Sequence, residues 1–196
     1  MDWNEVFEAP GFTYGTEPND FLREHAGRLE SPILCIAEGE GRNATYLATL
    51  GLEVHGVDGS SVGLAKARRL ADDRGVVITT EVADLADYEF GLERWAGIVS
   101  ISAHLPPEVR ARVHARIGPA LRRGGVLLLE AYAPSQLERG TGGPPDRAWL
   151  FPIETVKAEL GDAFDFEIAH ETEREVIEGA RHSGLASVTQ ILAVKR

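Results

Sequence analysis

A glycine-containing loop with several carboxylates nearby is the segment best suited to hold a ligand. Gly39 and Gly41 follow an apolar run at residues 33–37, and a residue without a side chain lets a ligand approach the backbone closely. Asp58 ends the next apolar run, roughly 20 positions after Gly39, where a carboxylate can accept hydrogen bonds from both hydroxyls of a ribose. A helix beginning near Asn43 would direct free N–H groups to this spot, which suits a carboxylate or phosphate. The pattern predicts a site for a nucleotide-type cofactor.

The charges of this loop favour one class of cofactor. Glu38 and Glu40 flank Gly39, and two carboxylates would repel a diphosphate. They would tolerate an ammonium or a sulfonium, and S-adenosylmethionine carries both of these cations and one carboxylate. The spacing Gly39-x-Gly41-x-x-Ala44 also fits the dinucleotide fingerprint. We therefore expect S-adenosylmethionine as the cofactor, with an NAD(P)-dependent oxidoreductase as an alternative.

The segments that must position this loop predict an α/β fold. Five apolar runs alternate with helical patterns between residues 33 and 132, which is typical of parallel strands buried between two layers of helices. Ser61 is expected to cap one of these helices, and residues 122–125 to form a turn. Residues 164–176 and 187–194 then form two strands whose link is too short for a crossover helix, so they should pair antiparallel. We expect a doubly wound, mostly parallel sheet.

Composition and charge limit the partners. The chain has 196 residues and a formal net charge of −11, so its surface should repel nucleic acids and anionic membranes, and we expect neither as a partner. Cys35 is the single cysteine, and the first residues lack the pattern of a signal peptide, so a cytoplasmic protein is expected. The six histidines show no metal-ligand spacing, so no metal is expected.

Several segments together resemble the class I S-adenosylmethionine-dependent methyltransferases, and most specifically the small relatives of the tellurite-resistance methyltransferases. The segment from Glu38 to Ala48 is similar to their glycine-rich motif. The resemblance covers nearly the whole chain, and it implies a Rossmann-like, seven-stranded sheet whose last strand is antiparallel. The other segments that carry it are residues 14–22, 104–106, 141–144 and 178–184.

The resemblance also implies roles for individual residues. Asp84 and Leu85 would contact the adenine, and Ser102 would lie near the methionine moiety. Two positions differ from the common pattern, because Cys35 stands in place of an Asp and Ala37 in place of a Gly. The expected cofactor-binding residues are Ala37, Glu38, Gly39, Glu40, Gly41, Asn43, Asp58, Gly59, Ser60, Asp84, Leu85 and Ser102.

The expected reaction is methyl transfer to a small-molecule acceptor. A soft nucleophile, such as a thiol or a chalcogen, needs little help from a general base, and the sequence shows no clear base motif. For an oxygen or nitrogen acceptor, His104 and His182 are the candidate bases. A non-catalytic protein that binds S-adenosylmethionine is a further alternative.

One domain, 1–196, should contain all of these parts. We expect an amino-terminal arm or lid at 1–30, a cofactor-binding core at 31–132, and a substrate loop with an antiparallel hairpin at 133–196. Glu130 interrupts the apolar run 126–132. A charge in such a run needs a partner or an opening to water, so Glu130 either faces the substrate or is a paired structural carboxylate.

Overall fold

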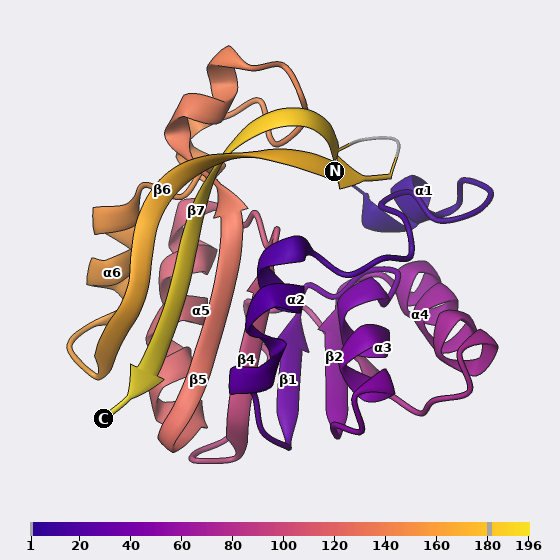
Figure 1. Ribbon diagram of the computed structural model, residues 1–196, viewed down its shortest axis with the longest axis horizontal. Helices are drawn as coiled ribbons and strands as arrows, with labels where there is room; N and C mark the ends of the chain where they lie inside the picture. Colours follow the sequence, from indigo (N-terminus) through magenta and orange to yellow (C-terminus); the bar gives the residue numbers. More distant parts are fainter. Residues whose placement is uncertain (1, 180–181) are drawn as a thin grey trace.

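A seven-stranded sheet forms the centre of the protein in this computed structural model, which describes residues 2–179 and 182–196 and leaves out the His182 side chain. The strand order is β3-β2-β1-β4-β5-β7-β6 (Figure 1). Strands β1 to β5 pair in parallel, and β7 runs antiparallel to both β5 and β6. The predicted doubly wound sheet with an antiparallel last strand is confirmed. The strands are β1 (Ile33–Ile36), β2 (Val54–Asp58), β3 (Thr79–Val82), β4 (Trp95–Ile101), β5 (Leu121–Tyr132), β6 (Phe164–Glu178) and β7 (His182–Lys195).

Helices cover both faces of the sheet (Figure 1). One face packs against α5 and α6 through side chains such as Ile117 and Val156. The other packs against α2, α3 and α4 through Leu22, Leu47 and Leu64, all fully buried. Each of these helices presents a single apolar stripe, as the spacing of its apolar residues requires. The helices are α1 (Trp3–Phe7), α2 (Asp20–His25), α3 (Arg42–Thr49), α4 (Ser61–Asp73), α5 (Pro107–Ala120) and α6 (Ile153–Leu160), with short 3-10 turns at Ala26–Arg28, Pro134–Glu138 and Arg147–Trp149.

Two element boundaries differ from the sequence prediction. Strand β5 begins at Leu121, which pairs with Trp95, so the predicted turn at residues 122–125 is part of the strand. The ladder shifts register between Trp95 and Gly97, which accommodates the irregular start of β5. Helix α4 is capped by Ser60, whose hydroxyl accepts from the Gly63 amide at 3.0 Å, and not by Ser61.

Glu130 is a paired structural carboxylate. It is 3% exposed and accepts hydrogen bonds from Arg174 of β6, Asn19 before α2 and Gln190 of β7. The Asn19 amide also donates to Glu178 at 2.8 Å. These contacts join the amino-terminal segment to the β6–β7 hairpin. The alternative in which Glu130 faces the substrate therefore loses its support.

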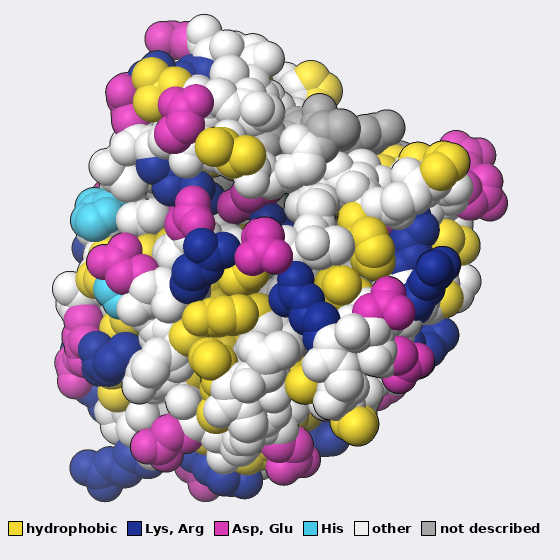
Figure 2. Space-filling model, turned by 45° about the vertical axis from the view of Figure 1, so that its right-hand side comes forward, with side chains coloured by type: hydrophobic (Ala, Val, Ile, Leu, Met, Phe, Trp, Pro, Cys, Tyr) yellow, Lys and Arg dark blue, Asp and Glu magenta, His cyan; other side chains and the backbone are white. Residues whose placement is uncertain are grey.

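The surface carries both signs of charge despite the acidic composition. On the face drawn in Figure 2, Lys and Arg side chains alternate with Asp and Glu, and apolar side chains lie scattered among them. Across residues 2–179 and 182–196, none of the helices has the length and apolar character that crossing a membrane requires.

Candidate active site

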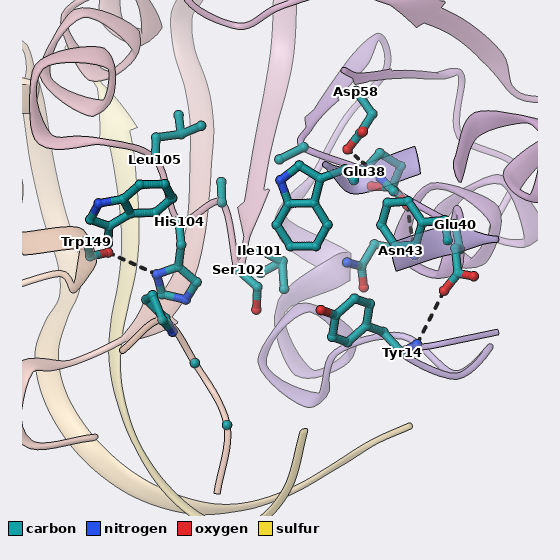
Figure 3. Close-up of a pocket in the computed structure, with 18 of the residues that line it drawn as sticks. Tyr14, Glu38, Glu40, Asn43, Asp58, Ile101, Ser102, His104, Leu105 and Trp149 are labelled. Carbon is teal, nitrogen blue, oxygen red and sulfur yellow. Dashed lines mark hydrogen bonds between the residues drawn. The ribbon is translucent and has the colours of Figure 1, made fainter. Parts of the chain in front are cut away.

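A cavity of about 560 Å³ lies above the carboxyl ends of β1, β2 and β4 (Figure 3). Its position is where the strand order reverses between β1 and β4, the usual ligand site of an open α/β sheet. Its volume is within the range of small-molecule sites. Asp58 and four segments line it: the amino-terminal arm with Trp3, Phe7 and Tyr14, the loop from Ala37 to Asn43, the segment Ile101–Leu105, and the segment from Gly142 to Trp149.

The two loop positions, 39 and 41, require glycine for different physical reasons. Gly39 has a φ of +60°, and a Cβ there would lie 3.0 Å from the Phe7 ring over the cavity. Gly41 has a φ of +87°, and its Cβ would lie only 2.5 Å from the Cβ of Ala67 in α4. Gly41 therefore lets α3 pack against α4. Ala37 also has a positive φ, 52°, which is the conformation that favours the glycine usual at this position.

Glu38 caps helix α3. Its Oε1 accepts from the backbone amides of Asn43 at 3.1 Å and Ala44 at 2.8 Å. Burial raises the pKa of this carboxyl to about 7, although the two amides and nearby Arg42 oppose that shift. The free N–H groups predicted to receive a ligand anion are thus already occupied by the chain itself. A diphosphate would have to displace Glu38 to use them.

Glu40 holds the amino-terminal arm in place. Its Oε2 accepts from the amides of Thr13 at 2.7 Å and Tyr14 at 3.3 Å (Figure 3), and its Oε1 from the Lys66 ammonium at 2.9 Å. Lys66 also donates to two carbonyl oxygens of the arm, those of Ala9 and Gly11. Both loop glutamates therefore have partners within the protein. The preference for S-adenosylmethionine over NAD therefore does not rest on free carboxylates in the loop. It rests on Glu38, which occupies the N-terminal amides of α3 that a diphosphate would need.

Asp58 lies at the carboxyl end of β2 and lines the cavity. Its Oδ2 accepts from the Gly39 amide at 2.9 Å, and its Oδ1 from the Ser60 amide at 2.7 Å. Burial raises the pKa of this carboxyl, while the two amides lower it. Each carboxylate oxygen has a further lone pair, so Asp58 can still accept hydrogen bonds from a ligand hydroxyl.

His104 lies at the opposite end of the cavity, beyond β4. Its Nδ1 is 3.1 Å from the Trp149 carbonyl oxygen (Figure 3), and the Tyr132 amide donates to its Nε2 at 3.4 Å. A carbonyl oxygen only accepts and an amide only donates, so Nδ1 carries the hydrogen. The ring also stacks on Tyr132, with the centroids 5.5 Å apart. Both nitrogens are therefore engaged by the backbone.

The structure brings most of the predicted site residues together. Eight of them line the cavity: Ala37, Glu38, Gly39, Glu40, Asn43, Asp58, Ser102 and His104. The side chain of His182 lies outside the described part of the chain. Five others do not line the cavity, and their cofactor contacts stay predictions: Gly41, Gly59, Ser60, Asp84 and Leu85.

Besides Gly41, which lets α3 pack against α4, three of those five have evident structural roles. Ser60 caps α4. Asp84 is exposed and accepts from the Ala86 amide at 2.8 Å, while Leu85 is buried in the core. Sequence reasoning missed Arg42, which lines the cavity beside Asn43. The sequence signal that could have identified Arg42 is its position directly after Gly41.

Comparison with known families decides the class of this site. Residues 33–125 match the family model described as a methyltransferase domain. The chain contains a methyltransferase domain, which spans just under half of its length. The matched segment of this methyltransferase runs from β1 to the start of β5, and it contains both the glycine loop and Asp58. The cofactor predicted from the loop, S-adenosylmethionine, is confirmed, and the oxidoreductase alternative is set aside.

Solved structures share the fold of this methyltransferase. A protein studied for the conversion of a disulfide bond into a thioacetal group during echinomycin biosynthesis has a TM-score of 0.78 and 21% identity, over 98% of this chain and 87% of that chain. TehB from Haemophilus influenzae has a TM-score of 0.71 and 18% identity, over 99% of this chain and 66% of that chain. It matches the predicted tellurite-type resemblance at the level of the fold.

A third structure was solved with a bound product of the cofactor. It is the magnesium protoporphyrin IX methyltransferase from Synechocystis PCC 6803 with bound S-adenosylhomocysteine. Its TM-score is 0.66 and its identity 19%, over 90% of this chain and 79% of that chain. A comparison with curated protein sequences found no match.

Proposed function

We propose that this methyltransferase acts on a small molecule and methylates a soft nucleophile, a thiol or a related chalcogen. Bound S-adenosylmethionine supplies an electrophilic methyl group. The acceptor sulfur, having lost its proton to water, attacks the methyl carbon. The bond from that carbon to the sulfonium sulfur breaks, its electron pair stays on the departing sulfur, and S-adenosylhomocysteine leaves.

The main support for this proposal is the hydrogen bonding of His104. This residue is one of two candidate bases, and both of its ring nitrogens already make hydrogen bonds to the backbone. A proton accepted at Nε2 would face the amide N–H of Tyr132 and lose the hydrogen bond that this amide donates. A thiol with an ordinary pKa of about 8.5 is already partly ionised near neutral pH, and its thiolate is nucleophilic enough to need no such base. A hydroxyl acceptor would need one.

The walls of the cavity support a small and partly apolar acceptor. Trp3 and Phe7 from the arm, and Leu105 and Trp149 from the opposite side, give it apolar walls, and polar side chains such as Asp58, Ser102 and His104 lie between them. Apolar walls with a few placed polar groups are typical of sites for small molecules. The structural neighbour from the study of a disulfide conversion also points to sulfur chemistry.

The cofactor would lie along the glycine loop in this proposal. Asp58 would accept hydrogen bonds from the ribose, Gly39 would allow close approach, and Ser102 would lie near the methionine moiety. Trp3, Phe7 and Tyr14 of the arm would cover the cofactor as a lid. An aromatic face toward a sulfonium is favourable, because the ring quadrupole attracts a cation.

The test compares matched acceptors with a labelled methyl donor. Benzenethiol, phenol and aniline share one ring and differ in the nucleophilic atom. We expect label on the sulfur of benzenethiol, together with an equal amount of S-adenosylhomocysteine, at rates at least tenfold above those for phenol and aniline. Preferential labelling of phenol or aniline would contradict the soft-nucleophile proposal.

A further inference from the structure

We propose that Trp149 is the specificity-determining wall of the acceptor end of the cavity, and that Arg110 of α5 is the positioning residue that holds it there. The acceptor end is the part of the cavity formed by His104, Leu105 and Trp149. The ligand that it would take is a methyl acceptor with a flat, apolar ring. The inference rests on the proposed function for the existence of an acceptor, and it adds the shape of that acceptor.

The acceptor end lies away from the residue expected to hold the ribose of the cofactor. Figure 3 shows Trp149 with His104 and Leu105 on one side of the cavity and Asp58 on the other. Ser102, expected near the methionine moiety, lies between these two groups (Figure 3), so the space beyond it is left for the acceptor. Trp149 also follows residues 33–125, the segment that matches the methyltransferase domain. Both observations favour the acceptor as the ligand that Trp149 contacts.

The acceptor end offers an aromatic surface more than a charge. The Trp149 side chain is half-buried and lies close to Leu105 (Figure 3). His104 and Asp146 are polar side chains at this end, and both make hydrogen bonds to the backbone of the same turn. His104 contacts the Trp149 carbonyl oxygen, and Asp146 accepts from the Ala148 amide. An indole packs well against another ring, either stacked or edge to face.

Arg110 fixes the backbone on both sides of Trp149. Its Nη1 donates to the carbonyl oxygens of Ala148 at 3.1 Å and Leu150 at 3.0 Å. The carbonyl oxygen between them, that of Trp149, lies 3.1 Å from His104 Nδ1. Three successive carbonyl oxygens therefore accept hydrogen bonds from side chains of other elements. This arrangement restricts the direction in which the Trp149 side chain leaves the backbone.

Arg110 is itself held rigidly between α5 and α6. It is 4% exposed, and its Nε and Nη2 donate to the Glu159 carboxylate at 3.0 and 2.9 Å. Its guanidinium lies over the Phe151 ring, 5.2 Å from the centroid. Burial opposes ionisation of Glu159, but hydrogen bonds from His114 and Arg110 lower the pKa of this carboxyl below its usual value. Glu159 therefore stays charged and orients the planar fork of Arg110.

The first experiment measures ring binding without turnover. The protein is loaded with S-adenosylhomocysteine and titrated calorimetrically with benzenethiol and with phenol, which share one ring. Trp149→Ala should lower the affinity for each probe about fivefold or more, because an aromatic contact and buried apolar area are lost. The factor should be the same for both probes, since the ring is shared. The affinity for S-adenosylhomocysteine should stay within about twofold of wild type.

A double-mutant cycle tests whether Arg110 acts through Trp149. Arg110→Lys keeps a positive charge beside Glu159, but an ammonium cannot span this carboxylate and two carbonyls as a guanidinium does. It should lower the affinity for both probes about threefold or more. In the Trp149→Ala background the same change should have an effect below about 1.5-fold, because the two residues contribute through one contact. A purely structural role of Arg110 would give the same loss in both backgrounds.

Arg94→Lys is the matched control. Arg94 also lies over a ring, that of Trp95, 4.4 Å from the centroid, but at the start of β4 and away from the cavity. Its replacement should change the affinity for either probe by less than about 1.5-fold. If Arg110→Lys does not fold, Glu159→Gln takes its place in the cycle, because it removes the charge that orients Arg110. It should lower both affinities about twofold or more, and only when Trp149 is present.

Unchanged affinities of both probes in Trp149→Ala would overturn the inference, and so would a wild type that binds neither ring. A Trp149→Ala variant that loses S-adenosylhomocysteine instead would assign this residue to the cofactor. Equal losses from Arg110→Lys in both backgrounds would contradict its positioning role. If Trp149→Ala weakens both rings alike and the labelled methyl group goes to phenol, the acceptor wall is supported and the soft-nucleophile proposal fails.

Discussion

At the scale of single residues, the loop glutamates show how one residue type can serve two purposes. Glu38 caps α3 through the Asn43 and Ala44 amides, and Glu40 holds the Thr13 and Tyr14 amides of the arm. Sequence proximity predicted that both carboxylates would face the ligand. Their partners could not be predicted, because the arm is distant in sequence and the direction of each side chain depends on the folded loop.

Glu38 should make the stability of the protein depend on pH. Its pKa is raised from 4.5 to about 7 in the folded state, so the folded protein binds more protons than the unfolded chain between these values. Stability contributed by this group is therefore present below about pH 4.5 and is lost as pH rises toward about 7. Glu38→Gln keeps an oxygen that can accept from the two amides and removes the titration.

The measurement is urea unfolding of wild type and Glu38→Gln at pH 5 and pH 8. From pH 5 to pH 8, the free energy of unfolding of the variant should rise relative to that of wild type by about 3 kcal/mol, as an upper value. The difference between the two proteins cancels the titration of other groups. A free-energy difference that stays constant with pH would show that Glu38 has no raised pKa.

At the scale of elements, the contact between α3 and α4 depends on Gly41. Gly41→Ala should destabilise the protein by about 2–4 kcal/mol, because it adds a methyl group against Ala67 in a left-handed conformation. Gly51→Ala is the matched control, since Gly51 has a φ of +82° with nothing within 4 Å of an added Cβ. It should cost only about 1–2 kcal/mol. If chemical denaturation showed the same loss of unfolding free energy in Gly41→Ala and Gly51→Ala, the packing role of Gly41 would be contradicted.

The arm is a second element whose position has a defined cause. Lys66 donates to Glu40 and to the carbonyls of Ala9 and Gly11. Lys66→Met should loosen the arm and increase the dissociation rate of S-adenosylhomocysteine at least fivefold in stopped-flow measurements, because three charge-assisted hydrogen bonds are lost. Lys157→Met, on α6, should leave this rate unchanged. A dissociation rate in Lys66→Met equal to that of wild type would show that the arm does not cover the cofactor.

At the scale of the whole molecule, alternating patterns were enough to predict the fold. The apolar runs 33–37 and 126–132 became β1 and the buried part of β5, and the short link after β6 correctly indicated antiparallel pairing. Local patterns carry this information because each strand and helix must bury its own apolar side chains. They do not specify contacts such as Arg42 with Glu178, which are 136 positions apart. Such contacts therefore became visible only in the folded molecule.

The measurement that tests the account most directly is a calorimetric titration of the wild type and Asp58→Ala with S-adenosylhomocysteine and with NADH. The wild type should bind S-adenosylhomocysteine at a single site and ignore NADH, because Glu38 occupies the amides that a diphosphate needs. Asp58→Ala should lower the affinity for S-adenosylhomocysteine at least tenfold, because the contact with the ribose is lost. Binding of NADH in preference to S-adenosylhomocysteine, or an unchanged affinity in a folded Asp58→Ala variant, would contradict the account.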